Sequence, residues 1–326
     1  MGRQRKSNKH LPRGMLIKHG AYYLKRANKW IRLADEYGPA LIKYAELVAE
    51  RQRVTTVADA VSHYLESSAK RLKPATLEGY RNSASNLAKV FGDAPLDALK
   101  PADVYGYLVR KGNVQANRDK ALLSAAYTHA RRIGAFSGDD PAKGLQYRNE
   151  EKPRERYVTD DEMTALLAAA SPKLACIARF IELTGMRQSD ALSVRIEDMD
   201  DEGIHYRQGK TGRRLVVTWS DELRAVVEDA KRLWRRFGRE YLFESRPKGR
   251  NAKRGPGPYT PSGLRALWRV ARAKAGLSDV RLHDLRAKAG SDVVSESDAQ
   301  RLLGHVDGKV TKRHYRRKAD RVSPVR

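Results

Sequence analysis

The sequence contains a single cysteine and no long apolar run. Cys176 is the only cysteine among 326 residues, so no intramolecular disulfide can form, as is typical of proteins in reducing compartments. The first residues lack the apolar segment that a signal peptide needs, and no stretch approaches the ~18 apolar residues of a membrane span. These absences predict a cytoplasmic protein.

Metal-binding and nucleotide-binding motifs are also missing. There is no H-E-x-x-H, no paired C-x-x-C and no aspartate cluster typical of a two-metal nuclease. Gly209-Lys210-Thr211 resembles the end of a phosphate-binding P-loop, but Ile204 stands where that loop requires glycine. We therefore expect no metal and no other cofactor, so any phosphate chemistry must rely on side chains.

Acidic residues are few relative to basic ones. The chain has 65 Lys and Arg against 39 Asp and Glu, a formal net charge of +26. Such a charge says nothing about the fold, but it predicts a polyanionic partner. Nucleic acid is the commonest such partner because phosphate contacts dominate its affinity; a membrane surface or another polyanion is the alternative.

The length predicts two or three domains at roughly 100–200 residues each. Residues 1–53 form the first segment, whose first 32 residues carry no Asp or Glu. We predict three short strands and one helix there, at residues 15–18, 21–25, 30–33 and 37–52. Tyr22, Tyr23 and Trp30 are the expected core of this module. The alternative is a disordered basic arm.

Two further domains are expected after this module. Residues 54–148 predict a bundle of four helices, two of which begin at Pro74 and Pro101. Residues 149–158 are polar and charged and are interpreted as a linker. Residues 159–326 mix helices with one hairpin whose turn is "GKTG". The predicted fold is multi-domain and mainly α, with small β elements.

Several residues of the third segment are candidates for phosphate chemistry. They are Arg187, Lys210, His283, Arg286, His305 and Tyr315. His283 and Arg286 lie three apart, on one face of a predicted helix, and Gly304 is the expected helix cap before His305. Taken singly, each has a structural explanation: a solvated charge, a loop lysine, a capping residue, a turn histidine or a basic tail. Their order along the chain points to a family.

Residues 159–326 resemble the tyrosine recombinases of the phage integrase family. The resemblance rests on five motifs in order: "TGMRQSDAL", "GKTG", "HDLR", "LLGH" and "VTKRHY". Residues 54–148 resemble the helical core-binding domain of that family. Residues 1–53, with "RQRKSNKHLPRGMLIKHGAYYLKR", resemble the arm-binding domain of lambda-type integrases. The expected catalytic domain is therefore a mixed α+β tyrosine-recombinase domain.

The resemblance implies a role for each candidate. Arg187 and Arg286 would bind the phosphate, with Asp190 as an acidic supporter, and Tyr315 would attack phosphorus to form a 3′-phosphotyrosine. A phenol has a pKa of about 10 and needs a base. His283 would take its proton, Lys210 would protonate the leaving 5′-oxygen, and His305 would donate a hydrogen bond to the phosphate.

Two positions depart from the pattern of the family. Tyr315 lies ten residues after His305, where nine is usual, and Ala287 stands where a histidine usually follows the second arginine. No other tyrosine lies near, so Tyr315 remains the predicted nucleophile. We expect little consequence from Ala287 because His283 and Arg286 are both present.

The resemblance also predicts the partners: double-stranded DNA with core-type and arm-type sites, a homotetramer assembled on DNA, and, as further candidates, a directionality factor and a host DNA-bending protein. The expected location is the cytoplasm of a bacterial host, at the nucleoid. Candidate DNA contacts are Arg3, Arg5, Lys6, Lys9, Arg13, Lys73, Thr76, Arg81, Lys111, Asn117, Arg118 and Lys120. Those in the bundle are equally consistent with solvated helix faces.

The predicted activity is site-specific recombination that integrates and excises a mobile element. Two alternatives stay open. A nicking-closing enzyme resembling a type IB topoisomerase would use the same chemistry without site specificity. A catalytically inactive DNA-binding regulator would bind without cutting, although the complete residue set argues against it.

Overall fold

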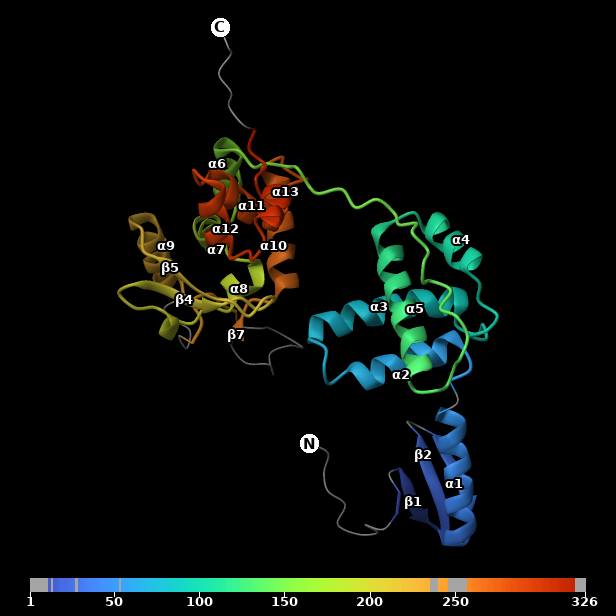
Figure 1. Cartoon of the computed structure of the whole chain (residues 1–326). Helices are drawn as coiled ribbons and strands as arrows, with labels where there is room; N and C mark the ends of the chain where they lie inside the picture. Colours follow the sequence, from blue (N-terminus) through green and yellow to red (C-terminus); the bar gives the residue numbers. More distant parts are fainter. Residues whose placement is uncertain are drawn as a thin grey trace. The chain divides into compact units, whose positions relative to one another are not determined.

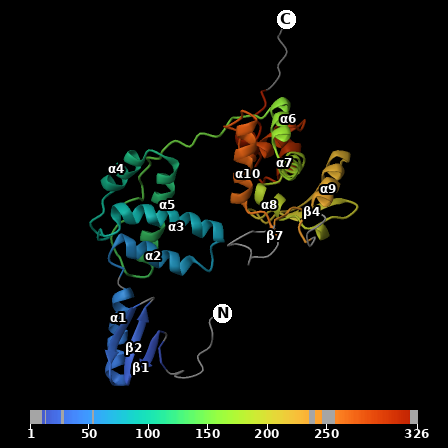
Figure 2. The same ribbon diagram turned by 180° about the vertical axis from the view of Figure 1, so that it is seen from behind.

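The computed structural model describes residues 11–12, 14–26, 29–52, 54–234, 240–245 and 257–319 (Figures 1 and 2). The chain divides into two compact units, Met1–Glu151 and Lys152–Arg326. The prediction of a multi-domain, mainly helical protein with small β elements is confirmed. None of the described helices is both long enough and apolar enough to cross a bilayer.

The chain begins with a small antiparallel sheet covered by one helix. Strands β1 (Met15–Lys18), β2 (Ala21–Arg26) and β3 (Lys29–Ala34) pair in that order, and α1 (Tyr37–Gln52) packs against them. The expected aromatic core is confirmed only in part, because Tyr22 packs against the buried cluster and Trp30 does not. Leu24 is buried, whereas Trp30 is 45% exposed. Trp30 pairs with Lys25, the neighbour of Leu24, and successive residues of a strand face opposite sides of the sheet.

Four helices follow, as predicted: α2 (Val57–Ser68), α3 (Pro74–Phe91), α4 (Pro101–Lys111) and α5 (Val114–Arg132). Pro74 and Pro101 occupy the first helical position, where the missing N–H costs no hydrogen bond. Gly112 ends α4 with a φ of 58°, a conformation that favours glycine. Leu87, Leu108 and Leu122 lie in the buried core of this bundle.

The segment interpreted as a linker, residues 149–158, makes contacts in both units. Asn149 is buried in the first, where its side chain donates to Leu108 O over 3.0 Å. In the second, Arg156 Nε donates to Asp279 Oδ2 over 3.0 Å and Arg154 bonds Asp284. The boundary between the units, after Glu151, falls inside this segment.

The second unit surrounds one buried helix, α11 (Leu282–Asp292) (Figure 1). Nine of its eleven residues are buried, and the two exposed ones are His283, in the first turn, and Asp292, at the end. The other elements are α6 (Asp160–Ala169), α7 (Pro172–Thr184), α8 (Gln188–Leu192), η1 (Ile196–Asp198), β4 (Gly203–Arg207), β5 (Arg214–Thr218), α9 (Asp221–Leu233), β6 (Glu244–Ser245), β7 (Gly257–Pro258), α10 (Pro261–Lys274), α12 (Glu296–Leu303) and α13 (Gly308–His314).

Candidate active site

Helix α11 positions two of the candidate residues. Arg286 is completely buried and donates hydrogen bonds to the carbonyls of Gly185 and Leu303, the latter over 2.7 Å. Its Nε has no hydrogen-bond partner among the described residues. Burial, followed by the charge of Arg187, lowers the pKa of Arg286. A buried guanidinium with an unused donor is suited to an anionic ligand.

Arg187 approaches from the turn between α7 and α8. Gly185 caps α7 with a φ of 60°, and two residues later Arg187 is the N-cap of α8. Arg187 Nη1 lies 3.8 Å from Asp190 Oδ2, and neither atom has a hydrogen-bond partner in the described part of the chain. Asp190 therefore holds the guanidinium electrostatically and leaves a buried donor for another acceptor.

The hairpin that carries Lys210 is attached to the rest of the site. Asp190 Oδ1 accepts the backbone N–H of Gly209 over 3.1 Å. Gln208 is fully buried and donates to Leu303 O over 2.9 Å, the carbonyl that also accepts from Arg286. Lys210 itself is exposed at the turn between β4 and β5.

His305 follows α12, which ends at Gly304 with a φ of 62°, as predicted. Its Nε2 lies 3.1 Å from Arg286 Nη2 and its Nδ1 lies 2.9 Å from Thr311 Oγ1. Because a guanidinium can only donate, Nε2 accepts and the proton is assigned to Nδ1. Burial, then Arg286 and Arg187, lower the pKa of His305 to about 4, so the ring is neutral at pH 7.

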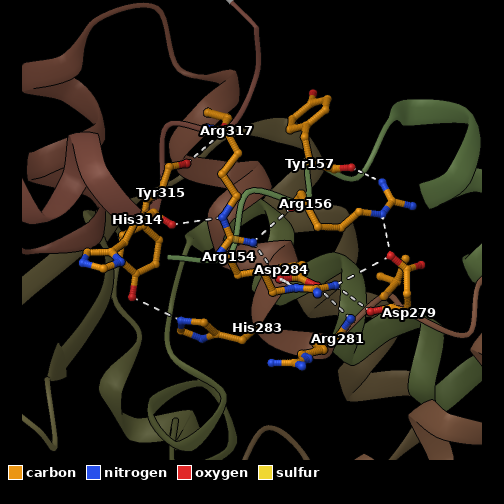
Figure 3. Close-up of polar contacts among 12 residues, drawn as sticks. Arg154, Arg156, Tyr157, Asp279, Arg281, His283, Asp284, His314, Tyr315 and Arg317 are labelled. Atoms are coloured by element: carbon orange, nitrogen blue, oxygen red, sulfur yellow. Dashed lines mark hydrogen bonds and ion pairs between the residues drawn. The ribbon is translucent and has the colours of Figure 1, made fainter. Parts of the chain in front are cut away.

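Tyr315 follows α13 and its ring lies among these groups. Its hydroxyl is 3.2 Å from His283 Nε2, as Figure 3 shows. Its ring centroid lies 4.7 Å from that of His305 and 5.3 Å from Cζ of Arg286. Although His283 is solvent-accessible, desolvation of its ring and then the charges of Arg286 and Arg317 lower its pKa to about 4. A neutral imidazole in this position can accept the phenol proton.

The structure thus brings His283, Arg286, His305 and Tyr315 into direct contact. Arg187 and Lys210 approach from elements that Asp190 connects. A cleft of ≈ 540 Å³ beside His283 is lined by basic side chains from α10 and from the start of α11. They are Arg265, Arg269, Arg272 and Arg281.

Sequence reasoning overlooked the polar residues that support this group. Gln208 and Thr311 carry no local signal that would have identified them. Asp284 was not among the candidates, yet it is the third residue of α11 and accepts the backbone N–H of Arg281 over 2.8 Å. An acidic residue at that position of a predicted helix is a capping signal that would have drawn attention to it.

The candidate DNA contacts fall into three groups. Arg3, Arg5, Lys6, Lys9 and Arg13 lie outside the described residues. In the bundle, the side chains of Lys73, Thr76, Arg81 and Arg118 are exposed. Three others make internal hydrogen bonds: Lys111 with Asp119, Asn117 with Asn149, and Lys120 with the carbonyl of Leu145. DNA binding by each of these residues stays a prediction.

Comparison with known proteins places the chain in a family. A model of the phage integrase family matches residues 156–321, just over half of the chain. The integrase of Escherichia phage HK022 is 23% identical, covering 96% of this chain and 96% of that protein. The integrase of Escherichia phage P2 is 29% identical over 116 residues, which cover 36% of this chain and 34% of that protein.

Solved structures share the fold. A lambda integrase dimer bound to a COC′ core site aligns with a TM-score of 0.69 at 21% identity, covering 98% of this chain and 99% of that one. A lambda integrase tetramer bound to a Holliday junction aligns with a TM-score of 0.66 at 20% identity, covering 91% of this chain and 97% of that one. The chain therefore belongs to the phage integrase family, and it is a tyrosine-type site-specific recombinase.

Proposed function

We propose that Tyr315 cleaves DNA by attacking a backbone phosphorus while His283 accepts its proton. The bond from phosphorus to the 5′-oxygen breaks as the bond to the phenolic oxygen forms, and Lys210 protonates the leaving 5′-oxygen. Arg187 and Arg286 bind the nonbridging oxygens and stabilise the charge that grows on them. The distance of 3.2 Å between Tyr315 Oη and His283 Nε2 is the observation that carries this proposal.

Reversal by the 5′-hydroxyl of another strand rejoins DNA, because the phosphotyrosine conserves the bond energy. Repeated on two strand pairs, this exchange integrates and excises a mobile element. Without DNA, Nε2 of His305 accepts from Arg286. When a phosphate binds, its negative charge favours the imidazolium, and the newly protonated Nε2 donates to the phosphate. Asp190 holds Arg187 and, through Gly209, the hairpin of Lys210.

The partners and location are inferred from the relatives. Residues 1–53 bind arm-type sites, residues 54–148 bind core-type sites, residues 149–158 link them to the catalytic domain, and the catalytic domain occupies residues 159–326. Lambda integrase has been solved as a tetramer on a Holliday junction, and we infer the same assembly here. The other inferred partners are a directionality factor and a host DNA-bending protein. The inferred location is the cytoplasm of a bacterial host, at the nucleoid.

The test begins by sequencing the host and phage DNA that stays covalently attached to the wild-type protein. A nicked duplex with the recovered site should then trap an adduct in the presence of a chelator, and Tyr315→Phe should form none. An adduct with Tyr315→Phe would overturn the proposed nucleophile. Recombination between two such sites, rather than relaxation alone, distinguishes a recombinase from a nicking-closing enzyme.

The domain assignment is tested separately. Deletion of residues 1–53 should spare cleavage at the core site and abolish binding to the arm sequences. A truncated protein that still binds arm DNA would show that these residues are not the arm-binding domain.

A further inference from the structure

The carboxylate next to His283 in the chain receives two arginines from distant segments. Asp284 is 1% exposed, and its oxygens accept from Arg154 Nε over 3.0 and 3.1 Å and from Arg317 Nη1 over 2.6 Å (Figure 3). Arg154 belongs to the segment that enters the second unit, and Arg317 lies two residues after Tyr315. One buried anion thus joins the entry of the unit to the residues that follow the tyrosine.

The backbone around Tyr315 is fixed at the same place. Ser291 Oγ donates to the carbonyl of Tyr315 over 2.7 Å and accepts the N–H of Arg317 over 2.8 Å. Arg317 also donates to the carbonyls of His314 and Arg156, over 3.0 and 3.1 Å. The side chain of Arg317 is therefore the central link between the tyrosine turn, the entry segment and α11.

Asp284 is what makes this arrangement stable. Burial opposes its ionisation, yet its hydrogen bonds, with Arg154 first among them, lower its pKa overall. Without the carboxylate, the guanidinium of Arg317, whose side chain is 7% exposed, would face that of Arg154, whose side chain is 28% exposed, and the two like charges would repel each other. Arg154 would keep its bond to the carbonyl of Asp279 and Arg317 its bonds to the carbonyls of His314 and Arg156. The repulsion should therefore shift both guanidinium groups without freeing either of them.

The phosphate-binding groups are held by other contacts. Arg286 is bound to Gly185, Leu303 and His305, and His305 is bound to Thr311. None of these contacts involves Asp284 or Arg317. Loss of the ion cluster should therefore displace the tyrosine and leave the activation of the phosphate in place.

We propose that Asp284, acting through Arg317, is a positioning residue that holds Tyr315 against His283, and that Arg154 ties this hold to the segment entering the catalytic unit. This inference rests on the proposed function, in which Tyr315 is the nucleophile. It predicts a group of variants in which the attack of Tyr315 on phosphorus is slowed while activation of the phosphate is retained.

Two assays on the full-length chain separate the attack of Tyr315 from the activation of the phosphate. Both use duplexes with the site recovered from the wild-type adduct. The first measures the rate of covalent adduct formation. The second uses a strand that ends in a 3′-p-nitrophenyl phosphate beside a 5′-hydroxyl. Sealing forms the bond from the 5′-oxygen to phosphorus, the hydroxyl loses its proton, and p-nitrophenolate leaves with the electron pair. Sealing needs the phosphate-binding groups and does not need Tyr315.

Arg317→Ala and Asp284→Asn should slow adduct formation by about tenfold to a hundredfold, the scale expected when a reacting group is misplaced by about 1 Å. Arg154→Ala should slow it less, and Arg317→Lys should restore part of the rate. Sealing should stay within about threefold of wild type in all four, because the groups in contact with phosphate are unchanged. Arg301→Ala, which removes an exposed arginine of α12, is the matched control and should affect neither assay.

An equal loss in both assays would mean that Arg317 supports the fold in general, and an unchanged adduct rate would mean that it positions nothing; either result overturns the inference. Tyr315→Phe distinguishes this failure from failure of the proposed function. It should lose the adduct and keep sealing. If it loses the adduct while Arg317→Ala cleaves normally, only the positioning role is wrong.

Discussion

The end of α12 offers a sharp test of how the hairpin is held. Gly304 has a φ of 62°, and a Cβ added there would lie 2.4 Å from Gln208 Nε2 and 2.6 Å from Leu215 Cδ1. Both distances are too short, so Gly304→Ala must move the ends of these two side chains, which the hairpin of Lys210 carries. Gln208 is fully buried and donates to Leu303 O, so its movement breaks a buried hydrogen bond.

The size of the effect has two parts. A left-handed alanine costs about 1–2 kcal/mol wherever it is placed. Relief of the clash adds about 1–3 kcal/mol, the usual penalty of an overpacked interior. Gly276→Ala is the matched control, because Gly276 has a φ of 71° and nothing within 4 Å of an added Cβ. Both variants carry the cost of a left-handed alanine, and only Gly304→Ala carries the cost of the clash.

Thermal unfolding measures the difference. At roughly 2–4 °C per kcal/mol for a unit of this size, the additional ~1–3 kcal/mol should make Gly304→Ala melt about 2–12 °C below Gly276→Ala. It should also form the covalent adduct more slowly at a temperature where both are folded, since a displaced Gln208 no longer ties the Lys210 turn to the carbonyl of Leu303. Equal melting temperatures, or equal cleavage rates, would refute the view that contact with α12 sets the position of the hairpin.

Three further outcomes are expected. Arg187→Ala should bind the core site within a few-fold of wild type and cut it about 10²–10³-fold more slowly, the usual effect of losing a transition-state donor; normal cutting would remove Arg187 from the site. The pKa of His305 is lowered to about 4 in the folded chain, against about 6.5 in the unfolded chain. Between pH 6.5 and pH 4 the unfolded chain therefore binds more protons than the folded chain. The free energy of unfolding should therefore fall as the pH drops through this window, by up to about 3 kcal/mol. Melting temperatures measured from pH 7.5 to 4.5 should fall less steeply for His305→Gln than for the wild type. Equal slopes in the two proteins would contradict the lowered pKa of His305. Asp119 in the bundle is fully buried and accepts from Tyr107, Lys111 and Gln115, so Asp119→Asn should destabilise the first unit by about 3–5 kcal/mol, a loss that calorimetry would detect.

Much of the local structure could be predicted because its causes are local. Pro74 and Pro101 begin helices and Gly304 ends one, since the fixed φ of proline and the left-handed φ of glycine act on their own backbone. The order of "HDLR", "LLGH" and "VTKRHY" was likewise readable without a structure. The face taken by Trp30 was not, because both faces of that strand carry large side chains and only packing selects one.

The sequence by itself determined the family, several helix ends and the identity of the six candidate residues, because each depends on residue type and spacing along the chain. Apart from Asp190, only the tertiary structure revealed the residues that support them, namely Gln208, Thr311 and Asp284. Asp284 meets Arg154 across 130 residues and Arg317 across 33. Ion pairs over such separations follow from how helices pack, and nothing in the local pattern distinguishes these arginines from the other basic residues of the chain.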